Sequence, residues 1–201
     1  KKVPEGGPLE EGLHVIITET QRCKNIIQGL LDFARDKEPQ KVEADINVIL
    51  EKALSILENE FRLQHVRLEK RLDGNMINIL LDENQIEQVY INILLNALHA
   101  VEADGVITVE SRVDSGRERI RVEIADNGCG ISEKDTQKIF EPFFSTKANG
   151  TGLGLAVSYG IIQNHRGDIR VFSEPGKGTR FVIDIPISTK NASKKNGKVS
   201  L

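Results

Sequence analysis

The fold of this chain is decided by residues 88–100, which read QVYINILLNALHA. The segment has the composition of a helix that is apolar nearly all round. Its polar side chains recur at steps of four, four and three residues, so they point the same way, and they are Gln88, Asn92, Asn96 and His99. A buried amide without a partner costs about 1–3 kcal/mol. Either a satisfied polar network in the core or a hard cation such as Mg²⁺, which prefers oxygen ligands, would supply those partners.

A lone acidic residue stands at the end of a predicted strand further along the chain. Asp126 follows the alternating segment 119–125 and opens the stretch DNGCGI at 126–131. An ionised aspartate only accepts hydrogen bonds, so it could bind the exocyclic amine of adenine and would repel the carbonyl oxygen of guanine. An Asp-Asn-Gly turn is also a common loop, and alone it predicts no more than a turn.

A second glycine-rich stretch, NGTGLGL at 149–155, leads into a predicted helix. Glycines leave backbone amides accessible, and the positive end of a helix favours phosphate. Between the two stretches, residues 138–149 read KIFEPFFSTKAN, where three Phe are expected to anchor the segment and residues 145–149 are polar enough to form a lid. Lys147 is then either a mobile cation for phosphates or an ordinary solvated lysine.

The rest of the chain alternates predicted helices with predicted antiparallel strands. Residues 176–179, GKGT, precede the last strand, where a hairpin turn is the ordinary explanation. The interleaving predicts an α+β fold, a two-layer α/β sandwich over residues 41–188, followed by a disordered tail at 189–201. The expected helices cover residues 47–63, 84–102 and 153–165, and the expected strands cover residues 66–72, 77–81, 106–113, 119–125, 168–173 and 179–185.

A long bundle-forming helix is predicted before this unit, over residues 9–35. Its apolar and small residues are spaced alternately by three and four after a first step of four, and they are Leu9, Leu13, Ile16, Thr20, Cys23, Ile27, Leu30 and Ala34. This spacing keeps one seam facing a partner helix. The seam packs either on the following domain or, as we favour, on a second copy of the chain in a multi-helix bundle.

Composition excludes several classes of function. The 201 residues carry 27 basic and 30 acidic side chains, a net charge of −3, which argues against electrostatic binding of nucleic acid or a membrane surface. No strictly apolar run exceeds three residues, so no membrane-spanning segment is expected. The two cysteines, Cys23 and Cys129, have neither metal-ligand nor disulfide-framework spacing, which suits a reducing, cytoplasmic interior.

These motifs, in this order, closely resemble the ATP-binding domain shared by sensor histidine kinases, gyrase-type topoisomerases, heat-shock 90 chaperones and MutL proteins. The resemblance covers residues 46–187 and implies a Bergerat-type ATP-binding fold. The motif EPFFSTK at 141–147, together with GTGLGL at 150–155, is similar to the corresponding motifs of the nitrogen-regulation type of histidine kinase. LLDFAR at 30–35 resembles the end of the second helix of that family's dimerisation and phosphotransfer hairpin, which implies that residues 1–38 are part of that region.

The resemblance implies a role for each site residue. Asn92 and Asn96 would bind Mg²⁺, while Asp126, supported by Thr179, would recognise adenine. Lys147 would contact phosphate from the lid, and His99 stands where several relatives carry a basic phosphate contact, although it could equally be a structural hydrogen-bonding residue. The remaining nucleotide-binding positions are backbone ones, with Gly128 and Gly130 near the base and Gly150, Thr151, Gly152, Leu153 and Gly154 near the phosphates.

The activity implied is a protein-histidine kinase that transfers the ATP γ-phosphate to a histidine for relay to an aspartate of a response regulator. That acceptor helix is absent from this sequence, and His14 lacks the acidic residue and proline that follow the family's acceptor, so autophosphorylation by this chain is not expected. His65 and His165 lie near element boundaries and are expected at the surface. Asn92 replaces the water-activating Glu of the ATP-hydrolysing relatives, which predicts slow hydrolysis. A nucleotide-binding, dimerising regulatory module and a conformational ATPase are the alternatives.

Overall fold

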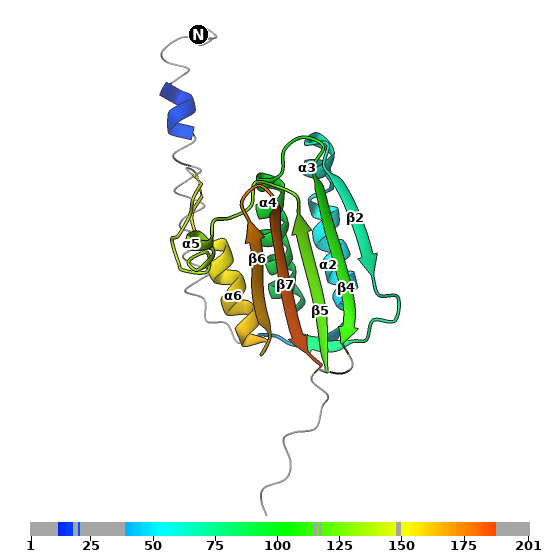
Figure 1. Cartoon of the computed structure of the whole chain (residues 1–201). Coiled ribbons are helices and arrows are strands. Elements are labelled where there is room, and N and C mark those ends of the chain that lie inside the picture. The colour runs from blue at the N-terminus through cyan, green and yellow to red at the C-terminus, as the bar shows by residue number, and fades with distance from the viewer. Residues whose placement is uncertain are drawn as a thin grey trace, which may run out of the picture.

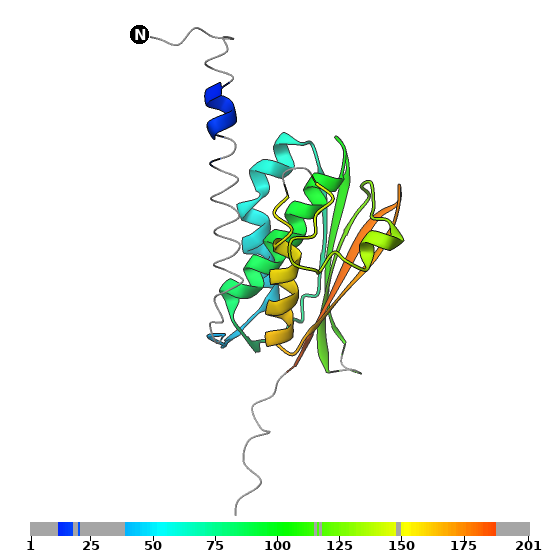
Figure 2. The same ribbon diagram turned by 90° about the vertical axis from the view of Figure 1, so that its left-hand side faces the viewer.

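The structure is a computed structural model that describes residues 12–17, 20, 39–114, 116, 118–147 and 150–187. Its centre is a five-stranded sheet in the order β2-β4-β5-β7-β6, with the main helices packed on one of its faces (Figures 1 and 2). Only the β2–β4 pair is parallel. This arrangement confirms the α+β, two-layer sandwich. The strands are β2 (Arg67–Leu72), β4 (Val106–Asp114), β5 (Arg119–Asp126), β6 (Asp168–Glu174) and β7 (Gly178–Pro186), and the main helices are α2 (Ile46–Ile56), α4 (Glu83–Ala100) and α6 (Gly154–Asn164).

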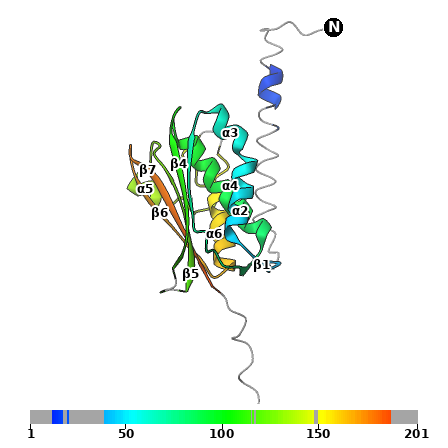
Figure 3. The ribbon, with the colours of Figure 1, turned by 90° about the vertical axis from the view of Figure 1, so that its right-hand side faces the viewer.

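The helix α4 lies at the centre of the helical layer, between α2 and α6 (Figure 3). It begins where the Asp82 side chain accepts a hydrogen bond from Gln85 N at 3.1 Å. The two neighbouring helices and the sheet cover most of its circumference, which is why the sequence is apolar nearly all round. Alternate residues of β4 and β5, such as Ile107 and Val122, are fully buried beneath it.

The single helix expected at residues 47–63 is wrong. It is divided at Leu57 into α2 and a short α3 (Glu58–Leu63). Leu57 N donates to Leu54 O at 3.2 Å, a tightened last turn that reorients the chain so that Phe61 reaches the core. The structure also has two elements that were not expected, β1 (Val42–Ala44) and α5 (Glu133–Thr136), and β3 is shorter than expected, at Ile79–Leu81.

The residues that follow Pro39 are fixed to the folded unit at the base of α4. Gln40 N donates to Asp82 Oδ2 at 2.9 Å, and Lys41 Nζ donates to the carbonyl oxygen of Asn164 at 2.9 Å. The strand β1 then pairs antiparallel with β3, which leads directly into α4. The chain is therefore held at the ends of both α4 and α6 as it enters the unit.

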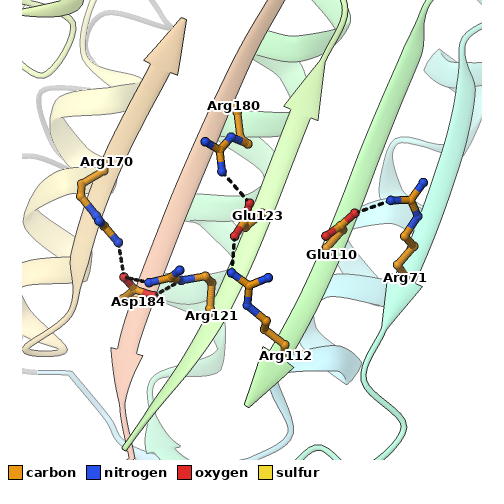
Figure 4. Close-up of polar contacts among 8 residues, drawn as sticks. All are labelled: Arg71, Glu110, Arg112, Arg121, Glu123, Arg170, Arg180 and Asp184. Carbon is orange, nitrogen blue, oxygen red and sulfur yellow. Dashed lines mark hydrogen bonds and ion pairs between the residues drawn. The ribbon is translucent and has the colours of Figure 1, made fainter. Parts of the chain in front are cut away.

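The open face of the sheet carries arginine–carboxylate pairs on all five strands (Figure 4). Glu110 pairs with Arg71 at 2.8 Å, and Glu123 pairs with two arginines at 3.0 Å each. Asp184 pairs with Arg121 at 2.6 Å and also with Arg170, and its side chain is only 5% exposed. Every carboxylate drawn in Figure 4 thus has at least one arginine partner.

Most of the predicted N-terminal helix and the predicted tail at 189–201 lie outside the described residues. Residues 12–17 and Thr20 are helical, and the apolar side chains of Leu13, Val15, Ile16 and Ile17 are exposed. The boundaries at 1–38, 41–188 and 189–201 remain predictions. Among the described residues, no helix combines the length and the apolar character needed to cross a bilayer.

Candidate functional site

The amide of Asn92 is held by the N-terminal turn of α6. Its Nδ2 donates to the carbonyl oxygen of Gly154 at 3.1 Å and to Ser158 Oγ at 3.3 Å. Its Oδ1 accepts no hydrogen bond from the described part of the chain. The nitrogen of this amide is therefore occupied by hydrogen bonds to α6, while its oxygen is available to bind another group.

The amide of Asn96, one turn further along α4, faces a cation from the lid segment. Lys147 Nζ donates to Asn96 Oδ1 at 2.9 Å. Partial desolvation lowers the pKa of Lys147, while the charges of Cys129 and Asp126 act in the opposite direction. This contact joins residues 51 positions apart and brings the predicted lid cation onto a predicted metal ligand.

Asp126 occupies the end of β5, as expected. Its Oδ1 accepts hydrogen bonds from Gly128 N at 2.9 Å and Thr179 N at 3.2 Å, which fixes the carboxylate between the loop and β7. Its Oδ2 accepts no hydrogen bond within the described ranges. Burial raises the pKa of Asp126, and the two backbone donors and the Lys147 charge only partly oppose that shift.

The glycines after Asp126 allow the loop to pack against the protein's own backbone. A Cβ at Gly128 would lie 2.3 Å from the carbonyl oxygen of Ala100, the last residue of α4. Gly130 has a φ of +70°, and a Cβ there would lie 2.1 Å from the carbonyl oxygen of Glu174. Cys129 N also donates to Ala100 O at 3.0 Å, so this loop is fixed to α4.

The segment that leads into α6 is closed by backbone hydrogen bonds. Phe143 N donates to Gly152 O at 3.0 Å, and Gly150 N donates to Lys147 O at 3.1 Å. The expectation that three Phe anchor the segment is wrong for Phe143, which is 62% exposed, because its φ of +68° turns its side chain away from the core. Phe140 and Phe144 do pack against the core.

The remaining residues of this segment offer backbone groups and a hydroxyl. The Leu153 side chain is buried, so only its backbone is available. Thr151 Oγ1 accepts a hydrogen bond from Leu153 N at 3.4 Å, at the start of α6. Ala148 and Asn149 lie outside the described residues.

Two histidines have environments that the sequence did not make obvious. His99 is exposed on α4, and desolvation together with the Lys147 charge lowers its pKa, which favours the neutral ring. The surface position expected for His165 is wrong, because its ring is buried between α4 and α6. His165 Nε2 accepts from Asp82 N at 2.9 Å, and Nδ1 donates to Ile161 O at 2.8 Å.

A hollow of about 430 Å³ opens beside Asp126. It extends from the end of β5 over the β6–β7 turn and does not include α4. Its lining residues are Ala125, Asp126, Phe172, Ser173, Glu174, Lys177, Gly178, Thr179 and Arg180. Asp126 and Thr179 therefore border a space large enough for a small ligand.

The class of protein is defined by three features. The helices α4 and α6 cover one face of the sheet, α4 carries two asparagines, and an aspartate stands at the end of β5. Together they are typical of the Bergerat-type ATP-binding fold. The chain belongs to the family of histidine kinase-, DNA gyrase B- and HSP90-like ATPases, whose pattern matches residues 81–189, more than half of the chain.

Two relatives of the chain are named as histidine kinases. The chain is 39% identical over 179 residues to the signal transduction histidine-protein kinase AtoS of Escherichia coli K12, covering 89% of this chain and 29% of that protein. It is 34% identical to the sensor histidine kinase ZraS of Salmonella typhi over 93% of this chain and 40% of that protein. The chain thus spans less than half of either relative.

Solved structures agree with the fold. The catalytic domain of the histidine kinase ThkA superimposes with a TM-score of 0.67 at 30% identity, covering 74% of this chain and 96% of that domain. ThkA in complex with its response regulator TrrA superimposes with a TM-score of 0.77 at 25% identity, covering 92% of this chain and 53% of that one.

Proposed function

We propose that this chain is the ATP-binding core of a protein-histidine kinase, which transfers the γ-phosphate of ATP to a histidine on a helix outside this sequence. The observation that carries the proposal is the hydrogen bonding of α4, where Asn92 keeps its oxygen available and Asn96 directs its oxygen at the Lys147 ammonium. The kinases AtoS, ZraS and ThkA are similar to the chain over 89%, 93% and 74% of its length.

The two amide oxygens on α4 are the proposed Mg²⁺ ligands. Asn96 Oδ1 already accepts from a cationic group, and amide oxygens suit a hard cation that takes its remaining ligands from water and phosphate. Bound Mg²⁺ would neutralise part of the triphosphate charge. Lys147 would then leave Asn96 and contact phosphate, with His99 beside it on the next turn of α4.

The adenine end of the site is assigned to Asp126. Because Gly128 N and Thr179 N hold Oδ1, Oδ2 is left to accept the adenine amine. The glycines at 128 and 130 keep this loop close to the base. The phosphates would lie at the start of α6, where backbone amides and the helix dipole favour anions, over Gly150, Thr151, Gly152, Leu153 and Gly154.

The chemistry assigned to this chain is positional. An in-line phosphoryl transfer needs its charge neutralised and its nucleophile delivered. Asn92 cannot accept a proton as a carboxylate can, so water at this site is poorly activated and hydrolysis is slow. Phosphate accordingly goes to the acceptor histidine and then to an aspartate of a response-regulator receiver domain.

The proposed assembly rests on the predicted N-terminal helix. We assign residues 1–38 to the second helix of a dimerisation and phosphotransfer hairpin, residues 41–188 to the catalytic unit and residues 189–201 to a tail. The exposed Leu13, Ile16 and Ile17 side chains support a homodimer formed through a helix bundle. ThkA, which is similar to this chain, is known in complex with a response regulator. The proposed location is the cytoplasm.

Phosphotransfer in trans tests the proposal. The chain is mixed with Mg-ATP and a separate protein that carries the acceptor helix of a related sensor kinase, and acid-labile phosphohistidine is measured. The Glu110→Gln variant, altered on the open face, should transfer phosphate as the unmodified chain does. Tight ATP binding without transfer would instead favour the regulatory module, and rapid release of phosphate to water would favour the conformational ATPase.

A further inference from the structure

Ser158 lies in the second turn of α6 and is completely buried. Its hydroxyl donates to the carbonyl oxygen of Gly154 at 2.9 Å, the i−4 contact that a helical serine often makes. The hydroxyl oxygen of Ser158 in turn accepts a hydrogen bond from Asn92 Nδ2 at 3.3 Å. Gly154 O accepts from both side chains, so Ser158, Gly154 and Asn92 form one closed set of hydrogen bonds.

This set distinguishes the two ends of the Asn92 amide. The two ends have nearly the same shape, but one donates and the other accepts. Gly154 O can only accept, and while the Ser158 hydroxyl donates to Gly154 O it also presents only an acceptor toward Asn92. A flipped amide would place Oδ1 near Gly154 O, which cannot donate, and the Ser158 hydroxyl could donate to Oδ1 only by giving up its bond to Gly154 O. That orientation is disfavoured because hydrogen bonds are lost.

We propose that Ser158 is a positioning residue that orients the Asn92 amide so that its oxygen, not its nitrogen, faces the metal–phosphate side of the site. The inference rests on the proposed function, because it assigns Asn92 Oδ1 to Mg²⁺. Ser158 itself would contact neither nucleotide nor metal, since its side chain is completely buried.

Nucleotide binding with and without metal tests the role of Ser158. The affinity for a non-hydrolysable ATP analogue is measured by calorimetry in Mg²⁺ and again in EDTA. Ser158→Ala should weaken binding about fivefold in Mg²⁺, the effect of losing one orienting hydrogen bond, and leave binding in EDTA unchanged. Ser158→Thr, which keeps the hydroxyl, should restore the affinity measured in Mg²⁺.

A matched control removes a different buried hydroxyl. Ser111 is 5% exposed and donates to Asn47 Oδ1 at 2.6 Å, away from α4 and α6. Ser111→Ala should lower thermal stability without changing the ratio of the two affinities. Equal weakening by Ser158→Ala in Mg²⁺ and EDTA, or no weakening at all, would overturn the positioning role.

The Asn92 side-chain amide gives a second readout that needs no metal. Its Nδ2 protons are hydrogen-bonded in the metal-free chain, so their NMR signals should exchange slowly with solvent and move in Ser158→Ala. Unmoved Asn92 signals in that variant also contradict the inference. Failure of the proposed function is recognised separately, because the unmodified chain would then bind the analogue equally well with and without Mg²⁺.

Discussion

Asp184 and Asp126 lie on neighbouring strands of one sheet, and their surroundings are opposite. Burial raises the pKa of Asp184, but the hydrogen bonds and charges of Arg121 and Arg170 outweigh it, and the net pKa lies below its usual range. Burial also raises the pKa of Asp126, where backbone donors and Lys147 do not outweigh it, and the net pKa lies above the usual range. The Asp184 carboxylate is satisfied by two arginines, whereas Asp126 Oδ2 accepts no hydrogen bond from the described residues.

The two shifts act on stability with opposite signs. The folded state binds a proton on Asp184 more weakly than the unfolded chain does. Asp184 therefore stabilises the fold at pH values above its ordinary pKa of about 3.9. This stabilisation is lost as the pH falls through the lowered pKa of the folded state. Asp126 binds its proton more tightly when folded, so its ionisation destabilises the fold as the pH rises through the raised pKa. This loss of stability falls at Asp126, the residue where a ligand is expected.

The largest effect on this contrast is expected from Asp184→Asn. The change leaves Arg121, whose side chain is 15% exposed, without its charged partner, and should lower the free energy of unfolding by about 3 kcal/mol. Urea unfolding at neutral pH measures it. Nucleotide affinity should not change.

The comparison variant for Asp184 is Glu110→Gln, which breaks a pair whose arginine is 67% exposed. It should lower the free energy of unfolding by less than about 0.5 kcal/mol. Equal losses in the two variants would show that burial does not distinguish these pairs.

The next effect is expected from Asn96→Ala. Removing the oxygen that Lys147 contacts should weaken Mg²⁺-dependent nucleotide binding about 100-fold, because a proposed metal ligand is lost. Calorimetry with the ATP analogue in Mg²⁺ measures the change, and EDTA provides the baseline. Unchanged affinity in Mg²⁺ would remove Asn96 from the metal site.

A smaller effect is expected from Asp126→Asn. An amide nitrogen in place of Oδ2 would repel the adenine amine and attract the guanine oxygen, so ATP affinity should fall about tenfold relative to GTP. Competition binding with the two nucleotides measures the ratio. The melting temperature should not fall, in contrast to Asp184→Asn, and a variant with an unchanged nucleotide preference would contradict the assignment.

The smallest effect is expected from His165→Asn, and it concerns pH. Burial lowers the pKa of His165, so below about pH 6.5 the unfolded chain takes up the proton first and stability falls. The unmodified chain should therefore lose more stability between pH 7.5 and 5.5 than the variant does, as measured by urea unfolding. His65→Asn, at an exposed residue, is the control, and equal pH slopes in His165→Asn and the unmodified chain would be the contrary result.

The parts of this molecule that the sequence predicted correctly are those with a regular period. The polar stripe of α4 and the alternation of β4 and β5 repeat over many residues, and both were confirmed. The place of Asp126 at the end of β5 was also predicted, because it needs only the strand boundary, while its role stays a prediction.

The parts that were missed depend on contacts between distant residues. From the sequence, His165 has only the features of a residue at an element boundary. Its burial depends on a contact with Asp82, which lies 83 positions away in the sequence. Ser158 reads as an ordinary helical serine, and its contact with Asn92 spans 66 positions. The break at Leu57 arises because Leu57 and Phe61 both enter the core, which no local propensity predicts.

The attachment of residues 40–44 to the base of α4 has a mechanical consequence. An 18-residue helix is a stiff rod about 27 Å long, and here one end is fastened to the incoming chain while its far half bears Asn92 and Asn96. A displacement of the chain at residue 39 would therefore act directly on α4, the helix that carries both amides. Within the described residues, α4 has no break between its attached end and Asn96.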